Sequence, residues 1–285
     1  MNTREQLAGV MRNIQTLPTL PDVALRLLEM GESPLSSTRD MASVVERDVT
    51  LAARVLKLVN APFFGMQREV TSVRQALLFL GISHLRSLVL SSVVLDLFDR
   101  EGSVGDFDRR EFWKHSLAVG AAARALAVRT RCVDAEIAFT AGLIHDIGKV
   151  VEDRYLHGEF VKVVELLKDP TRTMIDAERE VLDADHAQIG HHLTVHWNLP
   201  AVLRDAVGLH HNPEAAESSS AMAALIAVAD HLVRRLGVGK GGGADAPLQT
   251  ENLARCGLDS ETMESVIQDM VDVLEDQVGT LIASD

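Results

Sequence analysis

Apolar residues recur along most of the chain at the spacing of an α-helix. In the segment PDVALRLLEM, Val23, Leu27 and Met30 form a stripe of the i, i+4, i+7 type behind Pro21, a residue that suits the first turn of a helix. No run of six or more residues alternates cleanly between apolar and polar positions with turn residues at both ends, as a half-buried strand would. The pattern therefore predicts an all-α protein.

The helical pattern occurs in two groups, before and after a polar stretch near residue 105. The first group is predicted after Pro21, after Ser37, which resembles a helix cap with Asp40 three residues on, and at about 50–59, 72–80 and 83–98. The second group is predicted at about 109–129, 134–146, 158–168, 174–183, 185–197, 200–211 and 218–236. Two further helices are predicted at about 249–256 and 260–282.

Two glycine-containing stretches divide the chain into three expected parts. The polar stretch 99–108 has two glycines, and GVGKGGGADAP at 237–247 has five. We expect a helical N-terminal lobe over 1–105, a second helical lobe over 106–236, and a glycine-rich linker with C-terminal helices over 237–285. A simple surface loop would explain each glycine-containing stretch equally well.

The charge balance argues against a nucleic-acid partner. The 285 residues include 28 Lys+Arg and 41 Asp+Glu, which gives a formal net charge of −13. Binding to a phosphate backbone needs a basic surface, and neither a basic helix nor an aromatic platform is evident in the sequence.

The cysteines and the apolar runs favour a cytoplasmic protein without a membrane partner. Cys132 and Cys256 are the only cysteines, too few for a disulfide framework. The N-terminal residues do not have the basic and apolar regions of a secretory signal, and no apolar run approaches the roughly 18–20 residues of a membrane span.

Histidine is the residue type that points to chemistry, because ten of the eleven lie between residues 115 and 231. Glu111 and His115 are four residues apart and would share one face of a helix. His145 and Asp146 are adjacent, so their side chains can converge only where a helix ends, and Gly148 provides such an end.

Paired histidines occur at a second predicted helix end. His210 and His211 precede Asn212-Pro213, which stops a helix, and the partial negative charge of a helix C-terminus favours a nearby cation. His186 and Asp230 lie on two further predicted helices. A helical bundle can direct ligands from several helices to one centre.

These residues define a candidate metal site. The candidate ligands are Glu111, His115, His145, Asp146, His186, His210, His211 and Asp230. Imidazoles and carboxylates without thiolates suit a divalent transition metal; iron or manganese is favoured, with zinc, cobalt or nickel as alternatives. Eight donors exceed the needs of one ion and therefore predict two. Lys149 could hold a substrate phosphate as a point charge.

The remaining histidines are interpreted as surface or core residues, because a lone histidine is more often structural than a ligand. They are His84, His157, His191, His192, His196 and His231.

The sequence resembles the HD superfamily of metal-dependent phosphohydrolases and, more closely, the HDOD family, the HD-related output domain of bacterial signalling proteins. The HD-like strings are His115-Ser, HDIGK at 145–149 and AVADHL around Asp230. The HDOD-like blocks are LPTLPDVALRLLEM, VVERDVTLAARVLKLVNAPFFG, VTSVRQALLFLGISHLRSLVL, HWNLPAVLRDAVGLHHNPEAA and IAVADHLVRRLG. The resemblance covers about residues 15–236 and implies a helical N-terminal lobe packed on an HD-like bundle.

The resemblance leaves two functions open. Many HDOD domains have lost the HD metal ligands and act as regulatory modules, whereas all eight candidate ligands here match positions that resemble those of the HD-GYP phosphodiesterases. Asp146 and Lys149, within the HDxGK-like motif, are then the expected catalytic residues. The chain is either a bacterial signalling module that binds metal and contacts a signalling protein or a phosphorylated small molecule, or an active phosphohydrolase on a nucleotide or other phosphoester.

One motif of the HD-GYP enzymes is missing from this sequence. Their Gly-Tyr-Pro loop follows the paired histidines, where this chain has NPEAAESSS, and the single tyrosine is Tyr155. Hydrolysis of cyclic di-GMP by that family's mechanism is therefore not expected.

Overall fold

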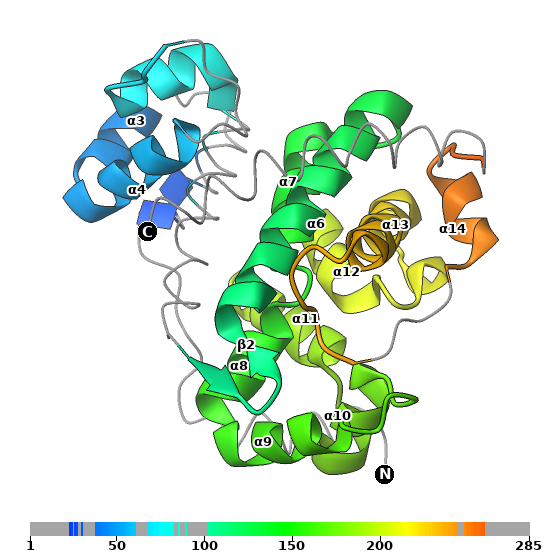
Figure 1. The fold of residues 1–285 in the computed structure, drawn as a ribbon. Coiled ribbons are helices and arrows are strands. Elements are labelled where there is room, and N and C mark those ends of the chain that lie inside the picture. Colours follow the sequence, from blue (N-terminus) through cyan, green and yellow to red (C-terminus); the bar gives the residue numbers. More distant parts are fainter. Residues whose placement is uncertain are drawn as a thin grey trace.

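The computed structural model describes residues 38–60, 68–82, 102–243 and 248–259, with single positions between 23 and 30 and at 85 and 89. Helices and one two-stranded hairpin account for the regular structure of these residues (Figure 1). The all-α prediction is confirmed. Most of the predicted helix at 83–98 and all of that at 260–282 lie outside the described residues, as does His84.

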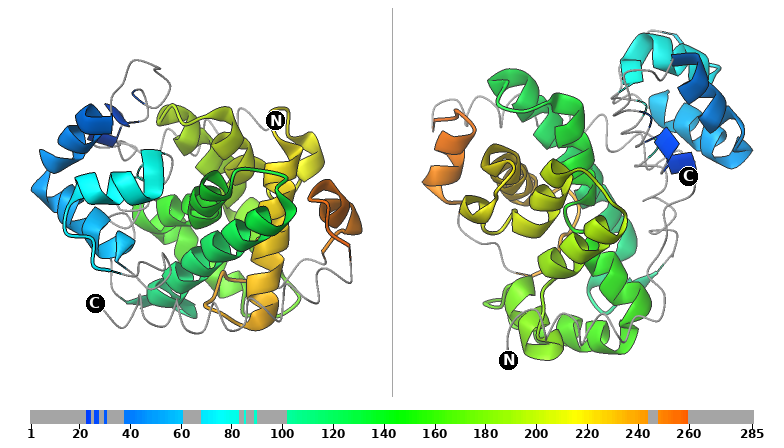
Figure 2. Two further views of the ribbon diagram at one scale, coloured as in Figure 1. Left: turned by 90° about the horizontal axis from the view of Figure 1, so that it is seen from above. Right: turned by 180° about the vertical axis from the view of Figure 1, so that it is seen from behind.

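The N-terminal lobe contains α3 (Thr38–Glu46), α4 (Val49–Val59) and a helical stretch at 73–82, close to the predicted 50–59 and 72–80. Asn60 joins two of these elements, because its side-chain amide donates to the carbonyl of Val70 (2.8 Å) and accepts from the amide of Val70 (2.7 Å). The views agree that α3 and α4 lie to one side of the remaining helices (Figure 2).

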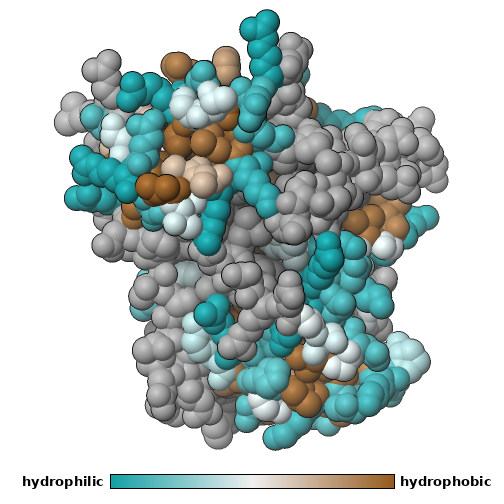
Figure 3. Space-filling view, turned by 60° about the vertical axis from the view of Figure 1, so that its left-hand side comes forward, coloured by the Kyte–Doolittle hydropathy of each residue, from teal (hydrophilic) through white to brown (hydrophobic). Residues whose placement is uncertain are grey.

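Large apolar side chains are exposed on this lobe. Val49 is 79% exposed, Leu78 74% and Phe79 68%. The space-filling view shows apolar side chains at the surface of the lobe among charged ones (Figure 3).

A β-hairpin fills the described part of the polar stretch 99–108. Strands β1 (Ser103–Val104) and β2 (Phe107–Asp108) pair antiparallel around a turn at Gly105, whose φ of 54° lies in the left-handed region. Phe107 packs edge-on against Phe160, with ring centroids 4.9 Å apart. The hairpin is thereby attached to the helical bundle.

Helix α6 (Arg109–Thr130) runs through the bundle and packs against α7 (Ala135–Ile144) and α13 (Ser220–Leu236). The side chain of Asp108 caps the start of α6, because it accepts hydrogen bonds from the backbone amides of Arg110 and Glu111. Gly120 and Gly142 allow α6 and α7 to touch, since a Cβ on Gly142 would lie 2.8 Å from the Cα of Gly120. Small residues therefore set the close packing of these two helices.

The bundle is completed by further helices. They are α8 (Ile147–Tyr155), α9 (His157–Leu166), α10 (Met174–Leu182), α11 (His186–His196), α12 (Ala201–Leu209), the 3₁₀ turn η2 (Pro213–Ala215) and α14 (Thr250–Arg255). Helix α8 was not predicted, because Gly148 was interpreted as a helix end. Gly148 instead allows α8 to contact α11, where a Cβ would lie 1.9 Å from the carbonyl oxygen of His186.

Among the described helices, none combines the length and the apolar character that crossing a membrane requires.

Candidate metal centre

Six of the predicted ligands form two clusters in the bundle. One consists of His115, His145 and Asp146, and the other of His186, His210 and His211. Within each cluster, one potential ligand atom per residue lies within 4.8 Å of the others. The residues come from α6, from the α7–α8 junction, from the start of α11 and from the end of α12.

Asp230 belongs beside the first cluster. Its Oδ1 on α13 is 2.8 Å from Nε2 of His115 and 3.8 Å from Nε2 of His145. The predicted ligand Glu111 is placed differently, because its carboxylate is about one-third exposed, pairs with Nζ of Lys114 at 2.5 Å and is in neither cluster.

The paired residues converge because each pair interrupts a helix, as the sequence predicts. Helix α7 ends at Ile144, and Asp146 has a φ of −98° and a ψ of 16° before α8 begins. Helix α12 ends at Leu209, so that His210 and His211 occupy the turn that follows. Departure from helical geometry lets adjacent side chains point to one place.

Backbone carbonyls fix the orientation of two buried histidines. Nδ1 of His145 donates to the carbonyl of Gly142 (2.7 Å), and Nδ1 of His210 donates to the carbonyl of Val207 (2.9 Å). A carbonyl can only accept, so Nδ1 carries the proton and Nε2 keeps its lone pair. Burial, and then the neighbouring His145, lower the pKa of His210 to about 3, which keeps its imidazole neutral.

A buried carboxylate orients His186. Glu178 on α10 accepts from Nδ1 of His186 (2.7 Å) and from its backbone amide (2.9 Å). Burial alone would lower the pKa of His186, but the carboxylates of Glu178 and Asp146 raise it to about 9. Burial and the charge of Glu178 also hold the pKa of Glu152 well above its ordinary value.

The carboxylate of Asp146 lies between the two clusters. Its Oδ1 is 3.1 Å from Nε2 of His186 and 3.7 Å from Nε2 of His210, whereas its Oδ2 is 3.4 Å from Nε2 of His145. Burial opposes ionisation, but the neighbouring His145 ring and the charged Lys149 hold the pKa of Asp146 well below its usual range. A carboxylate in this position can face both clusters at once.

Several buried atoms of the centre make no well-aligned hydrogen bond with the described residues, although Asp230 lies 2.8 Å from Nε2 of His115 and His186 lies 3.1 Å from Oδ1 of Asp146. They are both ring nitrogens of His115, Nε2 of His145, Oδ1 of Asp146 and Nε2 of His210. Unpaired buried polar atoms are destabilising and rare in native proteins. Divalent transition metals bind imidazole nitrogens and carboxylate oxygens, so the donor set fits such ions and would be satisfied by them.

Residues 237–243, which we call the glycine strap, run from the end of α13 past α6 (Figure 1). The amide of Lys240 donates to the carbonyl of Glu111 (3.0 Å), and Nζ of Lys149 donates to the carbonyl of Gly241 (2.9 Å) and to Oδ2 of Asp146 (2.5 Å). A Cβ on Gly241 would lie 2.9 Å from Nε2 of His115. The sequence suggests a flexible linker here, but residues 237–243 pack against His115 and Lys149, with glycine needed at Gly239 and Gly241 for the close approach.

Arg234 is a functional candidate that the sequence reasoning missed. Its Nε lies 2.9 and 3.0 Å from the two carboxylate oxygens of Asp230, and its Nη1 donates to the carbonyl of Gly242 (3.1 Å). The spacing of four residues between Asp230 and Arg234 on one helix was the available signal. Glu178 was also missed, because its contact with His186 depends on how α10 and α11 pack.

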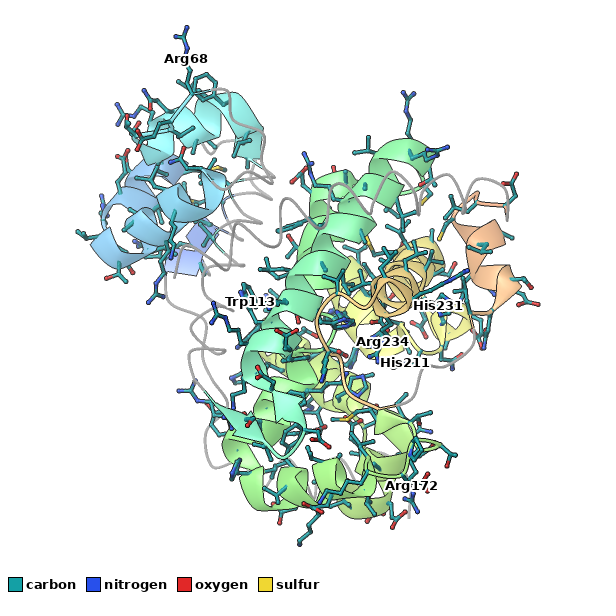
Figure 4. The ribbon with its side chains drawn as sticks, in the orientation of Figure 1. Arg68, Trp113, Arg172, His211, His231 and Arg234 are labelled. Carbon is teal, nitrogen blue, oxygen red and sulfur yellow. The ribbon has the colours of Figure 1, made fainter. Side chains whose placement is uncertain are left out.

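A cavity of about 280 Å³ opens beside the centre. Its lining includes Lys149, His186, His210, His211, Asp230 and Arg234. Figure 4 shows that His231 and Arg234, both on α13, lie near His211. His231, interpreted from sequence as structural, also lines the cavity. We call this cavity the metal-site pocket.

Known proteins share the fold of this chain. The family model for the HDOD domain matches residues 17–213. An HDOD domain protein of unknown function from Geobacter sulfurreducens has a similar structure, with a TM-score of 0.78, 26% identity, and coverage of 99% of this chain and 98% of that one.

Two further similar proteins are a structure of lower sequence identity and a protein about twice as long as this chain. A candidate phosphohydrolase from Shewanella amazonensis has a TM-score of 0.74 at 24% identity, over 96% of this chain and 98% of that one. An uncharacterized protein from Treponema pallidum (strain Nichols) is 27% identical over 237 residues, which are 82% of this chain and 45% of that protein. The chain thus spans about half the length of this curated relative. The family match, which covers more than half of the chain, shows that the protein belongs to the HDOD domain family.

Proposed function

We propose that this HDOD protein is a bacterial signalling module that binds a phosphorylated small molecule at a dinuclear metal site. The observation that carries the proposal is the position of the Asp146 carboxylate between two histidine clusters, beside a pocket that contains Lys149 and Arg234. The relatives described above are bacterial, and a signalling protein is the expected downstream partner.

Different side chains of the centre would bind the metal ions and the phosphate. His145 and His210 direct Nε2 lone pairs into the centre, and Asp146 and Asp230 supply negative charge. Two divalent ions, when bound, supply Lewis-acid stabilisation of the charge that develops on a phosphoryl group. Lys149 and Arg234 add fixed positive charge on the pocket wall, which favours a phosphate there.

The size of the metal-site pocket limits the ligand. Its volume of about 280 Å³ is at the small end of the ~300–1,000 Å³ that is usual for ligand pockets. A single small phosphorylated molecule suits this space better than a cyclic dinucleotide, in agreement with the missing Gly-Tyr-Pro motif.

Hydrolysis of that ligand is the second candidate function. The contact between Lys149 and Asp146 at the centre favours it, as does the name of the Shewanella amazonensis relative.

The test is calorimetric titration of metal-loaded protein with inorganic phosphate and a panel of phosphoesters, followed by assay for released phosphate. We expect saturable binding that Asp146→Asn abolishes and His192→Ala, an exposed change on α11, preserves. Turnover above that of free metal would establish the second candidate. Metal-loaded protein that binds none of the compounds would contradict the proposal.

A further inference from the structure

One wall of the metal-site pocket comes from a part of the chain beyond the residues that match the family model. Leu248, Gln249 and Asn252, at and before α14, line this wall, and the family match ends at residue 213. The wall faces the same cavity as Lys149 and Arg234. Its chemistry therefore bears on which phosphorylated molecule the pocket accepts.

Asn252 is the unusual residue of this wall. It is 5% exposed, and its backbone amide donates to the carbonyl of Gln249 at the start of α14. The Oδ1 atom is buried and unpartnered. Buried amide oxygens are nearly always paired, so an unpaired one that lines a pocket indicates a ligand atom that would complete it.

The surroundings of Asn252 restrict the chemistry of that ligand. Apolar side chains of Met174, Ile175 and Leu248 line the same cavity, and Gln249 provides a second amide. An amide presents a donor and an acceptor side by side, which matches the edge of a nucleobase, and apolar side chains suit its flat faces. A sugar alone would leave these apolar contacts unused.

We propose that Asn252 and Gln249 bind the base of a nucleoside monophosphate whose phosphate is held by Lys149, Arg234 and the metal centre. The inference rests on the proposed function, since it assigns the organic part of the phosphorylated ligand. Asn252 is the specificity-determining residue, because its buried amide oxygen lacks a partner.

The experiment compares three probes on metal-loaded protein by calorimetry: adenosine monophosphate, ribose 5-phosphate and inorganic phosphate. We expect adenosine monophosphate to bind about tenfold tighter than ribose 5-phosphate, the gain of one good amide–base pairing. Asn252→Leu should remove this gain and leave ribose 5-phosphate binding unchanged. Glu251→Ala, an exposed change on the same helix, should preserve it.

A melting curve of the ligand-free variant gives an independent readout. Asn252→Leu removes a buried amide oxygen that has no partner, so the variant should melt at the same temperature as the parent or higher. A clearly lower melting temperature would mean that the amide serves the fold, and would overturn the proposal. Equal affinity for adenosine monophosphate and ribose 5-phosphate would overturn the nucleotide subsite alone, whereas no binding of any probe would overturn the proposed function as well.

Discussion

Asp146 is the residue through which the two histidine clusters meet. Its two oxygens face different clusters, with His145 and Lys149 near Oδ2 and His186 near Oδ1. The two ions of the proposed centre therefore depend on it together, whereas each histidine belongs to one cluster.

This difference can be measured as metal content after dialysis. Asp146→Asn should weaken the binding of both ions. His115→Ala should remove about one of the two equivalents, because His115 belongs to the first cluster only. His192→Ala is the matched control, since His192 is exposed and in neither cluster. Loss of the same amount of metal in all three variants would argue against two separate clusters.

Glu178 controls the centre without being in either cluster. Its hydrogen bonds hold the ring and the backbone of His186 and keep the proton on Nδ1. Glu178→Gln should lower the affinity for the ion at the second cluster by about 10–100-fold, the usual effect of losing such a supporting carboxylate. Titration with cobalt, followed by its absorption spectrum, separates a weaker site from an unfolded one. An unchanged affinity would show that Glu178 serves only the fold.

At the residue scale, the sequence predicts what depends on local helix ends and misses what depends on packing. His145, Asp146, His210 and His211 could be grouped because glycine or proline follows each pair. Glu178 could not be linked to His186, since the contact requires α10 and α11 to be placed first. Spacing alone put Glu111 on the face of His115, but its carboxylate lies beside Lys114.

Among the elements, the glycine strap departs most from what its composition suggests. Glycine-rich sequence is typical of flexible linkers. Gly239 and Gly241 are instead required by contact, because a Cβ on Gly239 would lie 2.4 Å from the backbone nitrogen of His115. Composition cannot distinguish a glycine kept for flexibility from one kept for close approach.

Gly241→Ala tests whether the glycine strap packs closely against the centre. The new Cβ would lie 2.5 Å from Nη2 of Arg234 and 2.9 Å from Nε2 of the fully buried His115, so we expect a loss of about 1–3 kcal/mol in the free energy of unfolding. Gly158→Ala is the control, because nothing lies within 4 Å of its Cβ position on α9 and the change favours a helix. Urea unfolding measures both. Equal stability of the two variants would contradict the close packing of the strap.

A buried ion pair joins the start of α6 to α8. Arg109 donates to both carboxylate oxygens of Asp153 (2.6 and 2.8 Å), and both side chains are largely buried. Burial opposes ionisation of Asp153, but the hydrogen bonds from Arg109 hold its pKa below the usual range. The stabilisation from this carboxylate is therefore present above the ordinary carboxyl pKa near ~4 and is lost as the pH falls through the lowered native value.

Asp153→Asn should accordingly cost about 3 kcal/mol of unfolding free energy at pH 7, because it leaves the Arg109 charge poorly paired. The difference from the parent protein should shrink as the pH falls toward 3. Glu165→Gln, which removes an exposed pair with Lys168, should leave the unfolding free energy nearly unchanged. Urea unfolding measures these free energies across the pH range. A difference between the parent and Asp153→Asn that stayed constant with pH would contradict the account.

In the whole molecule, the candidate centre is the point where most of the bundle meets. Helices α6, α7, α8, α11, α12 and α13 each contribute or adjoin a side chain of the two clusters. The helical class could be predicted from periodicity, because amphipathic stripes are local. The arrangement around the centre could be reached only through the family resemblance, since spacing does not specify how helices pack.

The central claim is that this HDOD protein retains a dinuclear metal site. The most direct test is the metal content of the purified protein after exposure to iron or manganese and removal of excess ion, measured by mass spectrometry. The account predicts about two equivalents per chain, from two clusters that share Asp146. Less than about a tenth of an equivalent of any transition metal would contradict it, since the clustered donors would then bind none of these ions.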